Sequence, residues 1–186
     1  MRTLTAAMQM SLDGYVAGPN GELDWIFANM NAGLQDCTLE YLSGLDTMLM
    51  GRVSYLGQAE AWPTRTGPLA AAVNGHTKIV FTQTLRSADW TNSRIATGSP
   101  AEEIAQLQRQ PGKPIGVAGG ATFVQTLLKE QLVDQLRLTI HPVVLGGGLR
   151  LFTKPVALKL LEATTFDTGS VVHTYQVATT AGRGES

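Results

Sequence analysis

The stretch that most constrains the fold is residues 114–128, where an apolar run leads into two glycines and then a helical pattern. This order predicts a β-strand, a tight turn at Gly119 and Gly120, and a helix that begins near Ala121. Glycine lets a backbone approach a ligand closely, and the N–H groups at a helix start attract anions such as phosphate. The stretch therefore indicates either a nucleotide site or a plain packing turn, because the full dinucleotide and Walker motifs are absent.

Composition narrows the class of protein. A chain of 186 residues, 44% of them hydrophobic, fits one domain, which we place at 1–180 with a disordered tail at 181–186. The net charge of −1 argues against a nucleic-acid partner. Cys37 is the only cysteine, and the three histidines are too far apart in sequence for a metal motif. With neither a signal peptide nor a membrane-spanning run, we expect a cytoplasmic protein that holds no metal and contacts no membrane.

Strand and helix patterns alternate along most of the chain. Buried strands are predicted at 4–10, 46–50, 78–82 and 114–118, with a weaker one at 94–97. Helices are predicted at 25–42, just after Gly51, at 100–110 and from Ala121, whereas 57–75 looks irregular. An alternating strand at 133–140 is expected to continue to Leu145, and 158–166 with 170–179 predict a hairpin. The pattern favours an α/β fold with helices on both faces of a mainly parallel sheet.

Ligands of such sheets bind where the strands end, so the residues that follow the strands are candidates for the site. They are Asp13, residues 51–54, residues 82–84 and residues 119–122. The loop after Asp13 is rich in turn residues and long enough to act as a flap over a ligand. The triple glycine at 146–148 is predicted to be a turn, because no helix follows it.

The order of these motifs resembles the dihydrofolate reductase superfamily, and more closely the reductase domain at the C-terminus of the bifunctional riboflavin-biosynthesis enzyme RibD. The motifs are Ser11–Ala17, Gly51–Tyr55, Thr82–Leu85, Gly119–Phe123, and Pro142–Gly148 with Leu151–Phe152. The resemblance implies a three-layer α/β/α domain with an antiparallel C-terminal hairpin, which commonly forms a homodimer. It implies an NADPH-dependent oxidoreductase that transfers hydride to a C=N or C=O bond of a small heterocycle. The zinc-deaminase signature of the bifunctional enzyme is absent here.

By this resemblance, two glycine junctions would hold the pyrophosphate of NADPH, with Arg52 and the Thr82 region near its 2′-phosphate. The expected cofactor contacts are Gln9, Ala17, Gly51, Arg52, Ser54, Thr82, Gln83, Val117, Gly119, Gly120, Ala121 and Thr122. A guanidinium can bind phosphate in a bidentate manner; the alternative is that Arg52 is a surface side chain on a short helix. Related sequences often carry arginine in place of Gln83, which leaves the preference for NADPH over NADH open.

The residues expected to bind the substrate are Asp13, Asp24, Trp25 and Tyr55. Asp13 could bind ring amino groups or relay a proton as the catalytic carboxylate, or it could stabilise a turn. Asp24 stands near the acidic substrate residue of dihydrofolate reductases, but it could instead cap the following helix. Trp25 and Tyr55 could wall the pocket or belong to the core.

Two functions remain open from the sequence. The first is reduction of a riboflavin-pathway ribosylaminopyrimidine, a pteridine or folate, or a related compound. The second is nucleotide binding or sensing without turnover.

Overall fold

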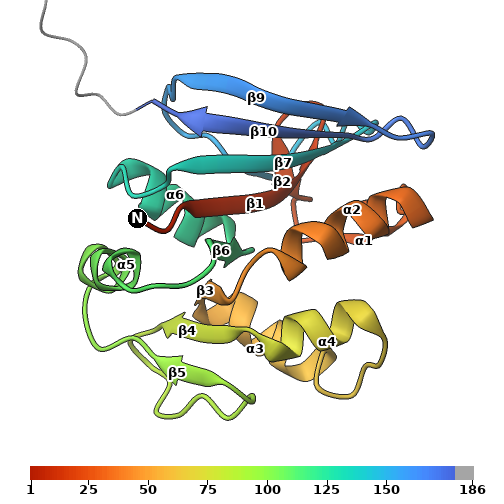
Figure 1. Cartoon of the computed structure of the whole chain (residues 1–186). Helices are drawn as coiled ribbons and strands as arrows, with labels where there is room; N and C mark the ends of the chain where they lie inside the picture. The colour runs from red at the N-terminus through yellow and green to blue at the C-terminus, as the bar shows by residue number, and fades with distance from the viewer. Residues whose placement is uncertain (179–186) are drawn as a thin grey trace, which may run out of the picture.

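The computed structural model describes residues 1–178 and contains an eight-stranded sheet in the order β5-β4-β3-β6-β1-β7-β10-β9. Figure 1 shows the strands stacked in this order, with β9 at the top and β5 at the bottom. The strands are β1 (Leu4–Ser11), β3 (Thr47–Gly51), β4 (Thr77–Phe81), β5 (Ser93–Ile95), β6 (Ile115–Ala118), β7 (Gln135–His141), β9 (Leu158–Thr165) and β10 (Val171–Val177). A separate ribbon pairs β2 (Tyr15–Ala17) with β8 (Leu149–Arg150).

In the part of the sheet with the order β5-β4-β3-β6-β1-β7, each pair of neighbouring strands is parallel. Strand β10 is antiparallel to both β7 and β9. The predicted mainly parallel sheet with a C-terminal hairpin is therefore confirmed. The hairpin reverses at residues 166–170, where the amide of Gly169 donates to the carbonyl of Phe166 at 2.8 Å. The tail predicted at 181–186 lies outside the described residues.

Helices cover both faces of the sheet, as predicted. They are α1 (Asp24–Phe27), α2 (Ala32–Ser43), α3 (Arg52–Ala61), α4 (Pro68–Gly75), α5 (Pro100–Arg109) and α6 (Ala121–Lys129). In Figure 1, α5 and α6 are grouped apart from α2, α3 and α4. Successive strand residues enter different core clusters: Leu49 packs with α5 and α6, whereas Met48 and Met50 pack with α3 and α4. This alternation is the period of two expected for a strand that is buried on both sides.

The predicted helix over 25–42 is wrong as a single element. The chain forms α1, leaves the helix, and begins α2 at Ala32, where the side chain of Asn31 accepts a hydrogen bond from the amide of Leu34 at 2.9 Å. Asn31 thus supplies a second start signal inside the run. Asp24 is not the cap of α1, because that position is Leu23 and Asp24 lies in the first helical turn.

Two further boundaries differ from the prediction. The segment 57–75 is not irregular, since it contains the end of α3 and all of α4, which begins at Pro68. Proline suits a first helical position because the amide there needs no partner. Strand β7 ends at His141 rather than at Leu145, because Pro142 has no N–H to donate and Val143 turns back to the carbonyl of His141 at 2.8 Å.

None of the helices within residues 1–178 is long and apolar enough to cross a membrane. In the same part of the chain, no three His, Cys, Asp or Glu residues gather into a group that could hold a metal ion.

A wholly buried lysine fastens β4 to its surroundings. The ammonium of Lys78 donates to the carbonyls of Asn74 and His76 at 2.9 Å and of Thr91 at 3.0 Å, and it lies 4.3 Å from the centre of the Trp90 ring. Burial lowers the pKa of Lys78 to about 8, while the three carbonyls favour the charged form. The lysine therefore remains an ammonium at neutral pH and joins α4, β4 and the loop before β5.

We expect Lys78→Met to lower the free energy of unfolding by about 2–4 kcal/mol, because it leaves three carbonyls without their buried donor. Urea unfolding followed by circular dichroism measures this loss. The matched control is Lys154→Met, at an exposed lysine, which should change stability by less than about 0.5 kcal/mol. Equal effects of the two substitutions would contradict a role for Lys78 in fastening the fold.

Candidate cofactor and substrate site

Two strand–glycine–helix junctions lie next to each other at the carboxyl edge of the sheet. Strands β3 and β6 are parallel neighbours, with Leu49 opposite Val117, and they lead into α3 and α6. Gly119 and Gly120 have φ of +66° and +77°, a left-handed conformation that glycine adopts readily. Neither α3 nor α6 has a side-chain cap at its start. The junctions therefore present two helix N-termini with amides available to an anion.

Ser54 ties the two junctions together. Its hydroxyl donates to the carbonyl of Ala118 at 2.5 Å and accepts from the side-chain amide of Gln58 at 2.9 Å. A Cβ on Gly119 would lie 3.1 Å from the Ser54 hydroxyl oxygen, which is a tighter contact than usual. Because the hydroxyl hydrogen is already donated, Ser54 has mainly its backbone N–H to offer an anion. Gln58 is a supporting residue that the sequence analysis missed.

The remaining predicted cofactor residues lie along the same edge. Arg52 is exposed at the first position of α3. The hydroxyl of Thr82, just after β4, accepts from the amides of Thr84 and Leu85 at 3.1 Å each, so it stabilises a turn that exposes Gln83.

An aromatic pair lies at this edge that the sequence analysis also missed. Phe81, the last residue of β4, and Phe123, in the first turn of α6, have ring centroids 5.0 Å apart. A Cβ on Gly51 would lie 3.3 Å from the Cβ of Phe123, so the α3 junction packs closely against α6. The sequence signal for this pair was an aromatic residue next to each motif: Phe81 precedes Thr82, and Phe123 follows Gly119–Thr122.

Asp13 is fully engaged in holding a neighbouring loop. One carboxylate oxygen accepts from the hydroxyl of Ser11 at 2.7 Å and the amide of Leu145 at 3.2 Å, and the other from the amide of Gly146 at 2.8 Å. The Ser11 hydrogen bond, with those of Gly146 and Leu145, lowers the pKa of Asp13 to about 2. Asp13 is thus ionised at neutral pH, and its geometry favours the structural alternative over proton relay.

The loop after β1 is fastened to the loop after β7 rather than standing free as a flap. The amide of Leu12 donates to the carbonyl of Val143 at 2.8 Å, and β2 pairs with β8. A Cβ on Gly148 would lie 2.1 Å from the carbonyl oxygen of Ala17, so only glycine fits at this crossing. The triple glycine is therefore a turn, as predicted, and it allows close backbone approach.

The predicted substrate residues divide between surface and core. Asp24 is exposed on α1, whereas Trp25 is buried and its ring meets His141 edge to face, with centroids 5.5 Å apart. Tyr55 is only 3% exposed, and its hydroxyl accepts from the amide of Trp90 at 3.0 Å. Tyr55, on the buried side of α3, therefore packs in the core.

Two other predicted cofactor residues, Gln9 and Val117, lie near the ends of β1 and β6. Gln9, near the end of β1, accepts a hydrogen bond from His141 at 2.7 Å through its side-chain oxygen. The side chain of Val117 is wholly buried in the core, which leaves its backbone as the part able to face a ligand. The structure therefore gathers residues 51–54, 82–83 and 119–122, and it places Gln9 and His141 further along the edge.

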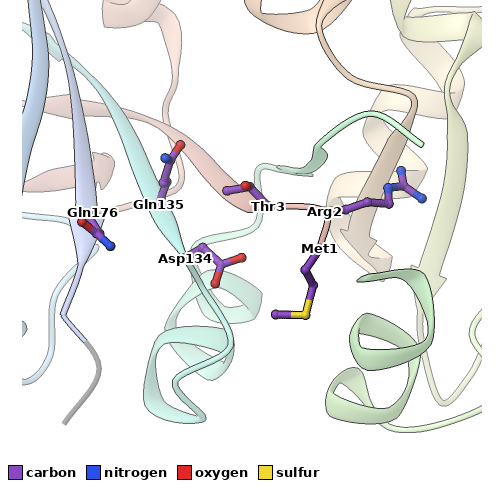
Figure 2. A pocket seen from close by; sticks show the side chains of 6 residues that line it. All are labelled: Met1, Arg2, Thr3, Asp134, Gln135 and Gln176. Carbon is purple, nitrogen blue, oxygen red and sulfur yellow. The ribbon is translucent and has the colours of Figure 1, made fainter. Parts of the chain in front are cut away.

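Two cavities lie away from the glycine turn at residues 119–120. One of about 240 Å³ opens at the amino ends of β1 and β7, as Figure 2 shows. It is lined by Met1, Arg2, Thr3, Asp134, Gln135 and Gln176. A second, of about 440 Å³, runs along the flank of α3 against residues 85–91. Apart from Tyr55 in the second, neither is lined by a predicted site residue, so the candidate site rests on the strand ends.

Comparison with known proteins finds one family model, a curated relative and solved structures that are similar to this chain. The family model of the RibD C-terminal domain matches residues 2–172. An uncharacterized protein from Bacillus subtilis (strain 168), YyaP, is 34% identical over 182 residues, which cover 94% of each chain. The crystal structure of a protein named for riboflavin biosynthesis from Shewanella sp. PV-4 has a TM-score of 0.75 at 22% identity, covering 95% of this chain and 99% of that one.

A dihydrofolate reductase has the same fold. The enzyme from Enterococcus faecalis, in complex with NADP(H), has a TM-score of 0.63 at 17% identity, covering 94% of this chain and 96% of that one. The predicted dihydrofolate reductase-like fold is therefore confirmed.

Asp13→Asn should lower the unfolding temperature at neutral pH, because the amide keeps only one acceptor oxygen and its NH2 group would face an N–H or O–H donor in place of the other. A depressed pKa contributes stability above the ordinary value of 3.8, and this contribution disappears as pH falls through about 2. The difference between wild type and variant should therefore be largest above about pH 4 and shrink towards pH 2. Thermal unfolding across this range measures it, with Asp36→Asn, at an exposed helix position, as the control. A difference independent of pH would count against the clamp.

Proposed function

We propose that this chain, which belongs to the RibD C-terminal domain family, is an NADPH-dependent reductase whose reductase unit spans residues 1–180. The observation that carries the proposal is the pair of uncapped helix starts at the neighbouring β3–α3 and β6–α6 junctions. Free backbone amides at two neighbouring helix starts suit a pyrophosphate and need no net positive charge on the protein. The solved dihydrofolate reductase with the same fold, whose complex contains NADP(H), supports this choice of cofactor.

In the proposed complex, the amides of residues 119–122 and 52–54 bind the pyrophosphate. The guanidinium of Arg52 and the side chain of Gln83 face the 2′-phosphate, since both are exposed beside this edge. The nicotinamide supplies the hydride, and the protein supplies orientation and exclusion of water. Asp13 acts as a positioning residue, because its carboxylate holds the 145–146 backbone next to the end of β1.

The substrate class we propose is a small heterocycle with a reducible C=N or C=O bond, such as a riboflavin-pathway ribosylaminopyrimidine or a pteridine. We place the enzyme in the cytoplasm, because a single cysteine suits a reducing compartment. Nucleotide binding or sensing without turnover is the alternative. Loss of the reduced-nicotinamide absorbance band in the presence of a candidate substrate separates the two functions.

Gly120→Asp tests the placement of the cofactor, and Gly120→Asn is its uncharged match. A Cβ here meets only Ser54 at 3.6 Å and Phe123 at 3.8 Å, which are ordinary contacts, so the Cβ of either variant fits. Both residues also tolerate left-handed backbone better than most. We expect Gly120→Asp to raise the Kd for NADPH about 100-fold or more above that of Gly120→Asn, because its carboxylate repels the pyrophosphate.

Titration of NADPH fluorescence measures the two affinities, and circular dichroism on the same samples verifies folding. If the two variants are folded and bind NADPH with equal affinity, the pyrophosphate does not lie at this turn. The cofactor proposal would then lose its main support.

We also propose a homodimer. Strand β9 has β10 on one side only, and Leu160 and Leu161 on it are 51% and 47% exposed. Unpaired strand edges in soluble proteins are usually covered or paired. Light scattering should give a dimer mass at micromolar concentration, and Leu161→Lys should shift it towards monomer, whereas Leu56→Lys on α3 should not. A wild-type monomer throughout this range would contradict the proposal.

A further inference from the structure

Gln9 faces the opposite side of the sheet from α5 and α6. The alternate residues Leu4, Ala6, Met8 and Met10 of β1 belong to the core cluster beneath those two helices. Gln9 therefore points to the face where α1 and α2 pack. On this face the hydroxyl of Tyr41, from α2, reaches the carbonyl of Thr5 in β1.

His141 joins Gln9 on that face and is held on several sides. It ends β7, opposite Ser11 of β1, and is wholly buried. Its Nε2 lies 2.7 Å from the side-chain oxygen of Gln9, and its Nδ1 lies 3.4 Å from the hydroxyl of buried Ser170. Trp25 of α1 covers the ring edge to face. In this arrangement Nε2–H donates to Gln9, and Nδ1 accepts from Ser170.

The pairing determines what Gln9 can offer a ligand. Its carboxamide oxygen is occupied by a buried imidazole, while the Gln9 side chain remains partly exposed. Within residues 1–178, no hydrogen bond engages its Nε2 group. Gln9 thus presents a fixed N–H donor at the end of β1, beside the proposed cofactor site.

We propose that Gln9 recognises a ring carbonyl of the substrate, as in a lactam or uracil ring, and that His141 is the positioning residue that orients it. This inference rests on the proposed reductase function. The group of Gln9 that this pairing leaves free is a donor, and it matches an acceptor such as a ring carbonyl. The donor therefore selects heterocycles that carry a carbonyl, because an analogue without one leaves the amide unpaired.

The first variants to test are Gln9→Met, which keeps an unbranched side chain without the amide, and Gln176→Met, the same change at an exposed position on β10. The probes are NADPH, 5-amino-6-(5-phosphoribosylamino)uracil and dihydrofolate, each titrated by calorimetry. Wild type should bind at least one ring compound. Gln9→Met should weaken that binding about 10- to 100-fold, with NADPH affinity changed less than about twofold. Gln176→Met should change neither affinity.

The positioning role of His141 is tested by rescue. His141→Leu removes the donor to Gln9 and should weaken ring binding as Gln9→Met does. His141→Gln retains an N–H donor and should recover most of the affinity. Where a probe is turned over, these variants should raise KM far more than they lower kcat, because the lost hydrogen bond is present before the reaction. A purely structural role would not separate His141→Gln from His141→Leu in two equally folded proteins.

The outcomes distinguish this inference from the proposed function. Ring binding that depends on Gln9 in a protein without NADPH affinity would support the inference and overturn the cofactor assignment. Failure of wild type to bind either ring compound would overturn the inference and leave the NADPH site standing. The inference is also overturned if Gln9→Met loses NADPH but keeps the ring compound, since Gln9 would then contact the cofactor.

Discussion

The parallel pairing of β3 with β6 is the constraint on which the candidate site depends. Because the two strands are neighbours and each leads directly into a helix, two sets of uncapped amides reach the same edge. The hydrogen bond from Ser54 to Ala118 fixes the helix starts relative to each other. Left-handed backbone at Gly119 and Gly120 turns the chain sharply enough for α6 to begin at once. The proposed phosphate site relies on backbone geometry, so it needs no net positive charge on a protein of net charge −1.

The parts of the fold that sequence could predict are those with a local signal. The strand before Gly119 and the capped helix from Pro100 can be predicted from apolar runs, glycine and capping residues. The break at Asn31 was not predicted because the apolar residues keep their helical spacing across it. Asn31 can cap α2 only because the chain has left α1 before it. Lys78 could not be foreseen as a core residue, because its acceptors are carbonyls brought together by α4, β4 and the loop before β5.

The candidate site shows the same division. The turn at Gly119 and Gly120 could be predicted from sequence because its left-handed backbone favours glycine, a requirement that each residue shows by itself. The partners of Asp13, Gln9 and Ser54 were not visible, since each hydrogen bond spans more than 60 positions to the loop after β7, to His141 or to Ala118. Motif matching names the side chain, but it does not say whether that side chain faces a ligand or another part of the protein.

This difference changes how polar residues at the edge should be ranked. Asp13 is the most conspicuous carboxylate in the sequence, yet its oxygens are satisfied and its pKa is lowered to about 2, so it is poorly suited to deliver a proton at neutral pH. Gln9 carries no charge, but the buried His141 binds its side-chain oxygen, and within residues 1–178 no hydrogen bond engages its amide hydrogens. A donor whose orientation is fixed in advance loses little entropy on binding and is costly to leave unpaired. Polar residues at this edge are therefore better ranked by the hydrogen-bonding groups that the fold leaves without a partner than by their prominence in the sequence.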